Sequence, residues 1–156
     1  MELPIENVQS YPRPPALEPL SHRIRVLLGG VVVAETTNAL RVLAPHHAPT
    51  YYLPPGDVAD GLKPARGSSF CEWKGRATYW SVHAGDAVAE AAAWSYPTPS
   101  ARFAALKDHV AFYAGHMDAC FVGEVRVLPQ PGDFYGGWVT PNLRGQIKGA
   151  PGTRHW

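Results

Sequence analysis

Cys71 and Lys74 are the residues whose types and spacing most plainly suggest covalent chemistry in this sequence. They lie three positions apart, and the following Gly75 favours a turn or bulge that would bring the two side chains together. A lysine ammonium group beside a thiol lowers the pKa of the thiol and favours the thiolate, which is the attacking species. The competing interpretation is a buried cysteine that behaves as a small hydrophobic residue, next to an exposed lysine. We favour the second interpretation and keep the first as a catalytic alternative.

Aromatic residues are concentrated in and after the same segment, residues 69–80. Walls of aromatic rings with a few polar groups are typical of pockets for small ligands. The same residue types are also favoured in β-strands, so the alternative is that the rings form the core of a sheet. The candidate ligand-binding residues are Trp73, Tyr79, Trp80, Trp94, Tyr96 and Trp138.

No combination of residues in the sequence is typical of a metal or phosphate site. The seven histidines lack the His-x₃-His and HExxH spacings, and the two cysteines are too far apart to form a cysteine-only zinc site. The glycine-rich C-terminal region matches neither phosphate-loop pattern. Glu72 could act as an acid or base, although a carboxylate at such a position more often pairs, here with Arg76, or faces solvent. We therefore expect no metal and no cofactor.

The composition excludes several classes of protein. The chain has 14 basic and 13 acidic residues and no basic stripe that would attract nucleic acid. Its apolar runs are shorter than the ~20 residues of a membrane-spanning helix. The first residues lack the basic and apolar regions of a signal peptide. We expect a cytoplasmic protein that binds a small molecule and neither nucleic acid nor a membrane, with a homodimer left open.

The frequency of glycine and proline, 15 and 16 of the 156 residues, predicts many turns and a mainly β chain. Residues 1–21 are rich in proline and predict an N-terminal arm with little room for a helix or a central strand. Residues 22–128 are expected to form a single β-rich domain, with a loop at 63–68. The expected strands are 22–28, 31–35, 39–43, 51–53, the central segment as far as 83, 87–96, 119–122 and 124–127.

One amphipathic helix is predicted between residues 98 and 115, because Thr98 is a suitable N-cap and hydrophobic residues recur at steps of three and four. Its expected buried face is Phe103, Leu106, Val110, Tyr113 and Met117. The tail, residues 129–156, is too rich in glycine and proline to form a regular element. Its aromatic rings favour burial, so we expect a long irregular C-terminal tail packed on the domain.

Residues 71–80, with the sequence C-E-W-K-G-R-A-T-Y-W, resemble the C-P-Y-K-G-x-A-x-Y-W signature of domain of unknown function 427. This bacterial and fungal family also carries a nucleotidyltransferase label. Further similarities occur in the same order at residues 23–26, 51–54, 93–97 and 110–113. The resemblance therefore covers about residues 20–128.

The resemblance implies a fold similar to the Mss4-like, or β-tent, group, in which two small antiparallel sheets meet at an angle. Relatives in that group bind zinc through paired C-x-x-C turns. Here Lys74 stands where the second cysteine of such a turn would be, so no zinc is implied. The sequence also lacks a Gly-Ser pair followed by metal-binding carboxylates, and so does not support the nucleotidyltransferase label.

These observations lead to three hypotheses about function. The first, which we favour, is the binding of a small organic or anionic ligand in an aromatic-lined pocket around Cys71 and Lys74. The second is an enzyme that uses Cys71 as its nucleophile, assisted by Lys74. The third is a structural or protein-interaction module that uses the aromatic tail.

Overall fold

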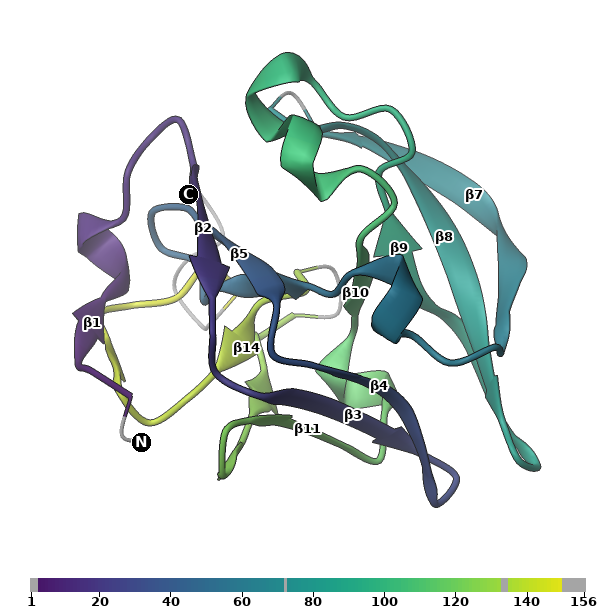
Figure 1. Ribbon diagram of the computed structural model, residues 1–156. Coiled ribbons are helices and arrows are strands. Elements are labelled where there is room, and N and C mark those ends of the chain that lie inside the picture. The colour runs from purple at the N-terminus through teal and green to yellow at the C-terminus, as the bar shows by residue number, and fades with distance from the viewer. Residues whose placement is uncertain (1–2, 72, 133–134, 150–156) are drawn as a thin grey trace.

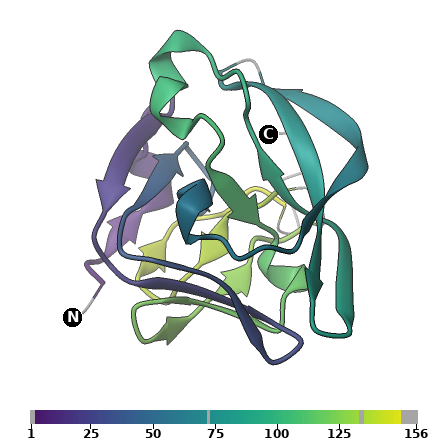
Figure 2. The same ribbon diagram turned by 45° about the vertical axis from the view of Figure 1, so that its right-hand side comes forward.

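The computed structural model describes residues 3–71, 73–132 and 135–149. In these residues the chain is mainly β, and its strands form several small antiparallel sheets and one parallel pair. Two sheets have four strands, one has three and two have two, so the expectation of two sheets was too simple. Figures 1 and 2 show the β7–β8–β9 layer on one side of the molecule and the β3–β4 hairpin along its base.

The first four-stranded sheet contains the β3–β4 hairpin, which the sequence predicted. Ile24, Val26 and Leu28 alternate into the core along β3, and Gly29 and Gly30 close the hairpin with positive φ angles. A Cβ atom at Gly29 would lie 2.6 Å from the backbone oxygen of the neighbouring β8 strand, so only glycine allows this close approach. In the order β12-β11-β3-β4, the strands are β3 (Ile24–Leu28), β4 (Val31–Thr36), β11 (Ala119–Val122) and β12 (Val125–Arg126).

The second four-stranded sheet includes a strand where the sequence predicted a loop at residues 63–68. This strand, β7, lies at the edge of the sheet, which is where a strand tolerates a proline such as Pro64. Its register against β8 shifts between Pro64 and Ser68, and Gly67 adopts a φ of 90° within this irregularity. In the order β10-β9-β8-β7, the strands are β7 (Leu62–Cys71), β8 (Gly75–Ala84), β9 (Ala87–Ser95) and β10 (Val110–Phe112).

The two faces of this second sheet contribute to different clusters of apolar residues. Because side chains alternate along a strand, one face supplies Trp80 and Val82 to the main hydrophobic core, which β3, β4 and β11 complete. The opposite face supplies Ala77, Tyr79 and Trp94 to a second, smaller cluster of apolar residues. The second cluster forms the base of the candidate site described below.

Both ends of the chain contribute strands, and the segment after Pro129 is therefore not wholly irregular. Strand β2 of the N-terminal arm lies at the edge of a three-stranded sheet in the order β2-β5-β6. These strands are β2 (Ala16–Leu20), β5 (Ala39–Leu43) and β6 (Thr50–Tyr52). The two-stranded sheets pair β1 (Glu6–Asn7) with β15 (Leu143–Arg144) and β13 (Leu128–Pro129) with β14 (Trp138–Val139).

The prediction of an amphipathic helix between residues 98 and 115 is wrong. This segment forms a short 3-10 helix, strand β10 and a second 3-10 helix instead. Asp108 has a φ of 62°, which no helix allows, and its N–H donates to the Tyr96 carbonyl. Val110 then pairs with β9 rather than continuing a helix. The 3-10 helices are η1 (Val8–Ser10), η2 (Pro55–Asp57), η3 (Ala101–Leu106) and η4 (Ala114–His116).

The hydrophobic residues that suggested the helix are nevertheless mostly inside. Phe103, Leu106, Val110 and Met117 are buried, and Tyr113 is half-buried. Hydrophobic residues spaced by three and four positions are therefore found in a series of short buried elements as well as on one face of a helix. Strand β10 is buried on both faces, so its own period of two is hidden.

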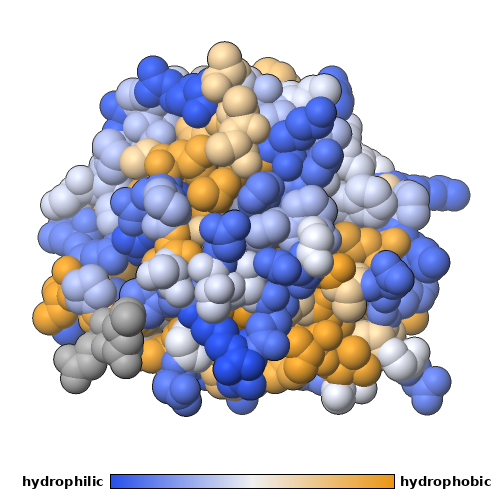
Figure 3. Space-filling model, in the orientation of Figure 1, coloured by the Kyte–Doolittle hydropathy of each residue, from blue (hydrophilic) through white to orange (hydrophobic). Residues whose placement is uncertain are grey.

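The surface seen in Figure 3 mixes hydrophilic and apolar residues, with apolar residues gathered low on this face, over the region of β3 and β4. Val31 and Val32, near the tip of that hairpin, are 39% and 43% exposed. Within the described residues, no helix has the length and apolar character needed to cross a membrane.

Leu106 tests the packing of the segment that replaces the helix. Its side chain is fully buried beside Phe103. Leu106→Ala is expected to lower the free energy of unfolding by ~2–5 kcal/mol, measured by urea denaturation. The exposed neighbour provides a control, since Lys107→Ala should change this free energy by less than ~0.5 kcal/mol. A similarly small effect of Leu106→Ala would contradict this packing.

Candidate functional site

A cavity of about 540 Å³ lies over the second apolar cluster, on the face of the β7–β10 sheet opposite the main core. It is built from both ends of the chain as well as from the sheet, because the N-terminal arm, the loop before β6 and the C-terminal segment all reach it. Six of the eight predicted site residues line this cavity: Cys71, Trp73, Lys74, Tyr79, Trp94 and Tyr96.

The tight turn predicted around Cys71 and Gly75 is present. Cys71 pairs with Gly75 at the end of the β7–β8 hairpin, and Lys74 lies in the turn between them. Ser100 holds this turn in place, since its N–H donates to the Lys74 carbonyl at 3.0 Å and its hydroxyl donates to the Trp73 carbonyl at 2.5 Å. The turn therefore delivers Cys71, Trp73 and Lys74 to the cavity together.

The Lys74 ammonium group lies over an aromatic ring. Its Nζ is 5.8 Å from the centroid of Tyr96, within the range of a cation–π interaction. Cys71 is half-buried, whereas Cys120, the other cysteine, is 1% exposed in the main core. Burial raises the pKa of the Cys120 thiol to about 12, so that thiol is chemically protected. Cys71 is thus the cysteine available to a ligand in the cavity.

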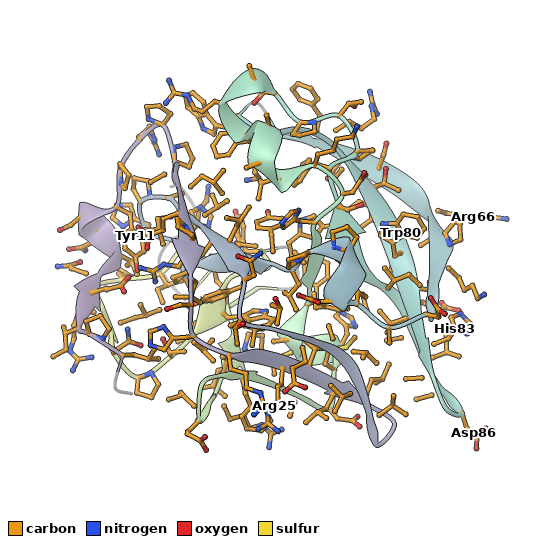
Figure 4. All side chains as sticks on the ribbon, viewed as in Figure 1. Tyr11, Arg25, Arg66, Trp80, His83 and Asp86 are labelled. Atoms are coloured by element: carbon orange, nitrogen blue, oxygen red, sulfur yellow. The ribbon has the colours of Figure 1, made fainter. Side chains whose placement is uncertain are left out.

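The remaining two predicted residues, Trp80 and Trp138, lie outside the cavity. Tyr79 pairs with Trp94 across β8 and β9, and the next residue along β8 must point to the opposite face. Trp80, labelled in Figure 4, accordingly packs against the main core and donates its indole N–H to Ser95 at 2.9 Å. Trp138 is 1% exposed and donates its indole N–H to the Phe112 carbonyl.

Several cavity residues were not among the predicted site residues. Tyr52 follows Tyr51 on β6 and faces the second cluster, while Tyr51 faces the main core. The adjacent tyrosines could have indicated this, because neighbouring residues of a strand point to opposite faces and one of the two would face the cavity. Ser69 lies two positions before Cys71 on the same strand, so strand periodicity could have found it, but no local pattern connects the remaining residues to Cys71. The additional lining residues that carry polar groups are Arg13, His47, Thr50, Tyr52, Ser69, Tyr113, Tyr135 and Lys148.

The tyrosines in the cavity wall are buried or half-buried, and two of them contact neighbouring side chains. Ser69 and Tyr79 are 2.8 Å apart through their hydroxyl oxygens, and the rings of Trp94 and Tyr113 lie 4.5 Å apart. Burial raises the pKa of Tyr113 to about 12, with a further contribution from Tyr79. Burial also holds the pKa of Tyr52 and Tyr96 well above the usual range. At neutral pH these residues therefore remain neutral hydroxyl groups that can donate hydrogen bonds.

His47 is neutral at physiological pH. Its pKa is lowered from 6.5 to about 4, first because the ring is buried and second because Lys148 and Lys74 are close. An edge-to-face contact with Tyr135, with ring centroids 5.1 Å apart, fixes one side of the imidazole. His47 thus supplies a neutral imidazole next to cationic side chains.

The described charged residues that line the cavity are all positive. Arg13, Lys74 and Lys148 line it, and the described lining residues include no aspartate or glutamate. Glu72, considered above as an acid or base, and Phe134 of the tail lie outside the described residues. Within the described part of the chain, no group of three histidine, cysteine or carboxylate side chains is placed to hold a metal ion.

A family model for a domain of unknown function, DUF427, matches residues 16–123, which include most of the cavity wall. The chain belongs to the DUF427 family. The match confirms the resemblance noted for residues 71–80. No curated protein matches the chain. Residues 135–137 and Lys148, which complete the cavity, lie beyond the matched region.

The lowered pKa of His47 predicts a specific loss of stability in acid. Below about pH 6.5 the unfolded chain binds a proton at His47 that the folded chain excludes until about pH 4, so stability falls as the pH falls. His47→Gln removes this contribution, and urea unfolding between pH 7 and pH 4.5 should then show a loss smaller by ~1–2 kcal/mol. Equal pH dependence of the wild-type and His47→Gln proteins would contradict the burial of a neutral His47.

Proposed function

We propose that this member of the DUF427 family binds a small organic anion with a planar aromatic body in the cavity around Cys71 and Lys74. The observation that carries the proposal is the lining: cations from three separate segments, neutral phenols and aromatic rings, with no described carboxylate among them. A volume of about 540 Å³ lies within the usual range for small-molecule pockets.

The positive charges support an anionic ligand. Arg13, Lys74 and Lys148 come from the N-terminal arm, the β7–β8 turn and the C-terminal segment, so folding assembles like charges at one place. Bringing like charges together costs free energy, and a bound anion would offset that cost. Hydrogen bonds between ionised partners are also stronger than those between neutral groups.

The aromatic walls support a planar body for the ligand. Trp94 is in contact with Tyr113, and its ring meets the Tyr52 ring edge-on with centroids 6.4 Å apart. Trp73 and Tyr135 add further rings to the lining. Aromatic groups prefer offset or edge-to-face contacts with one another, so a flat ring system would find suitable partners here.

Binding of 2-naphthoate and of its neutral analogue 2-naphthamide tests this proposal. Isothermal titration calorimetry should show that 2-naphthoate binds and that 2-naphthamide binds at least tenfold more weakly. Lys74→Met should weaken naphthoate binding by about tenfold, which corresponds to ~1.4 kcal/mol. Lys63→Met removes an exposed lysine of β7 outside the cavity and should leave the affinity unchanged. Absence of naphthoate binding, or equal binding of the two compounds, would refute an aromatic anion as the ligand.

A second candidate function is catalysis with Cys71 as the nucleophile and Lys74 assisting. The specific observation in its favour is that Cys71 lines the cavity while Cys120 is buried elsewhere. A thiolate in a pocket with cationic side chains could attack an electrophilic ligand. We rank this candidate below simple binding.

Iodoacetamide labelling of Cys71 as a function of pH separates the two candidates. For a simple binding pocket, the pH dependence of Cys71 labelling should be the same in the wild-type and Lys74→Met proteins. Cys120 should remain unlabelled in the folded protein because it is buried. Rapid labelling of Cys71 near pH 7 that slows in Lys74→Met would instead favour the catalytic function. Lys63→Met serves again as the control.

The third hypothesis, a module that interacts through its aromatic tail, has less support. Trp138 is buried against Tyr51, and Tyr135 lines the cavity, so neither ring is displayed as a free aromatic surface. The family resemblance supports an Mss4-like, or β-tent, arrangement of the sheets as a proposal. We also propose that the protein acts in the cytoplasm. A homodimer is a further possibility, which measurement of the mass in solution would test.

A further inference from the structure

Gln130 is a buried polar residue whose entire side-chain amide is used in contacts with two distant segments. The residue is 2% exposed and does not line the cavity. Its Oε1 accepts the Ala48 N–H at 3.2 Å, and its Nε2 donates to the Lys148 carbonyl at 2.9 Å. Its backbone N–H donates to the Gly137 carbonyl at 2.9 Å. A side chain this buried and this fully bonded has one orientation.

The orientation of the Gln130 amide follows from these partners. A backbone N–H can only donate and a backbone carbonyl can only accept, so the atom facing Ala48 is the oxygen and the atom facing Lys148 is the nitrogen. Gly137 preserves the arrangement, since a Cβ there would lie 2.3 Å from the Gln130 Oε1. The Gln130 Nε2 can therefore act only as a donor.

The same nitrogen determines the tautomer of His47. The Gln130 Nε2 lies 3.1 Å from the His47 Nδ1, and because the amide nitrogen donates, Nδ1 must accept and carry no proton. A neutral imidazole then carries its proton on Nε2. The described residues provide no hydrogen-bond partner for this Nε2, and the His47 ring lines the cavity. The Nε2–H group is therefore available to donate a hydrogen bond to a molecule in the cavity.

We propose that Gln130 holds His47 as a neutral Nε2–H donor that recognises an acceptor oxygen of the ligand, beside the cations Lys148 and Lys74. The inference rests on the proposed function for the identity of that oxygen, which would belong to the carboxylate or other oxyanion of an aromatic ligand. Gln130 is a positioning residue, because it touches His47 and Lys148 and lies outside the cavity.

The surroundings of His47 keep the ring in this neutral form. The charged and titratable groups that act on it are Lys148, Lys74, His46 and Arg13, and Tyr135 packs edge-on against it. All four charged or titratable groups lower the pKa of the imidazole. A neutral Nε2–H group flanked by cations can donate a hydrogen bond to an anion that the cations attract. The same site would bind cationic ligands poorly.

Nitrogen-15 NMR of the full-length labelled protein at about pH 8 tests the tautomer directly. His47, assigned by comparison with His47→Gln, should show a protonated Nε2 and an unprotonated Nδ1. His109 is an internal reference for the opposite tautomer, since its Nδ1 lies 3.1 Å from the Lys107 carbonyl, which can only accept. A proton on the His47 Nδ1 would overturn the inference.

Gln130→Glu tests the role of the positioning residue with little change of shape. A carboxylate cannot donate to the His47 Nδ1, so His47 should take a proton on Nδ1, either as the other tautomer or as a cation with a raised pKa. Gln130→Met, which has neither donor nor acceptor, should leave the tautomer of His47 unrestrained. Retention of the wild-type nitrogen pattern in a folded Gln130→Glu protein would show that Gln130 does not control His47. If neither variant folds, the wild-type spectrum still decides the tautomer.

The contact with the ligand is tested in the same spectra with 2-naphthoate. Addition of 2-naphthoate should shift the His47 Nε2–H resonance while the Nδ1 resonance changes little. A Gln130→Glu protein in which His47 is neutral with its proton on Nδ1 should bind 2-naphthoate about tenfold more weakly. Naphthoate binding without a change at Nε2–H would refute the ligand contact. If 2-naphthoate does not bind at all, the proposed function and the ligand contact both fail, whereas the tautomer measurement stands separately.

Discussion

Burial of the Trp138 indole is the contact on which the candidate site depends. Its ring packs 5.2 Å from that of Tyr51, and its side-chain and backbone N–H groups donate to the carbonyls of Phe112 and Pro49. An indole buried in this way stabilises its position by several kcal/mol, on the order of 3–5. Trp138 thereby anchors the C-terminal segment across β6 and β10, and the residues before and after it complete the cavity.

The C-terminal segment can approach the sheets only because it carries two glycines before Trp138. A Cβ at Gly136 would lie 2.0 Å from the ring of Trp94, and a Cβ at Gly137 would collide with Gln130 and the Ala48 carbonyl. The close approach places Tyr135 and Lys148 on the cavity and gives Gln130 its contacts. Ordering the C-terminal segment costs conformational entropy. In its ordered position the segment forms a second wall of the cavity, which the four-stranded sheet does not provide.

The site combines several hydrogen-bond donors with rigid walls. Phenols with raised pKa values, a neutral histidine and lysines from two segments all offer donors, and aromatic rings limit their movement. Such a pre-ordered set of donors fits the anionic ligand that we propose, because little rearrangement would be needed on binding. The thiol of Cys71 is a described lining group that would allow the proposed site to react covalently with a ligand.

Local sequence patterns determined the hairpin at Gly29-Gly30, the turn between Cys71 and Gly75, and the mainly β character, because glycine conformations and strand periodicity act over a few residues. Local patterns misjudged residues 98–115 and 63–68, where pairing with distant strands overrode the apparent periodicity and the proline. Local patterns identified most of the cavity residues that the β7–β10 sheet and its turn contribute, but they also assigned Trp80 to the site. Only the tertiary structure brought Arg13, His47 and Lys148 to Lys74, since hydrogen bonds such as that from Gln130 to His47 join residues 83 positions apart.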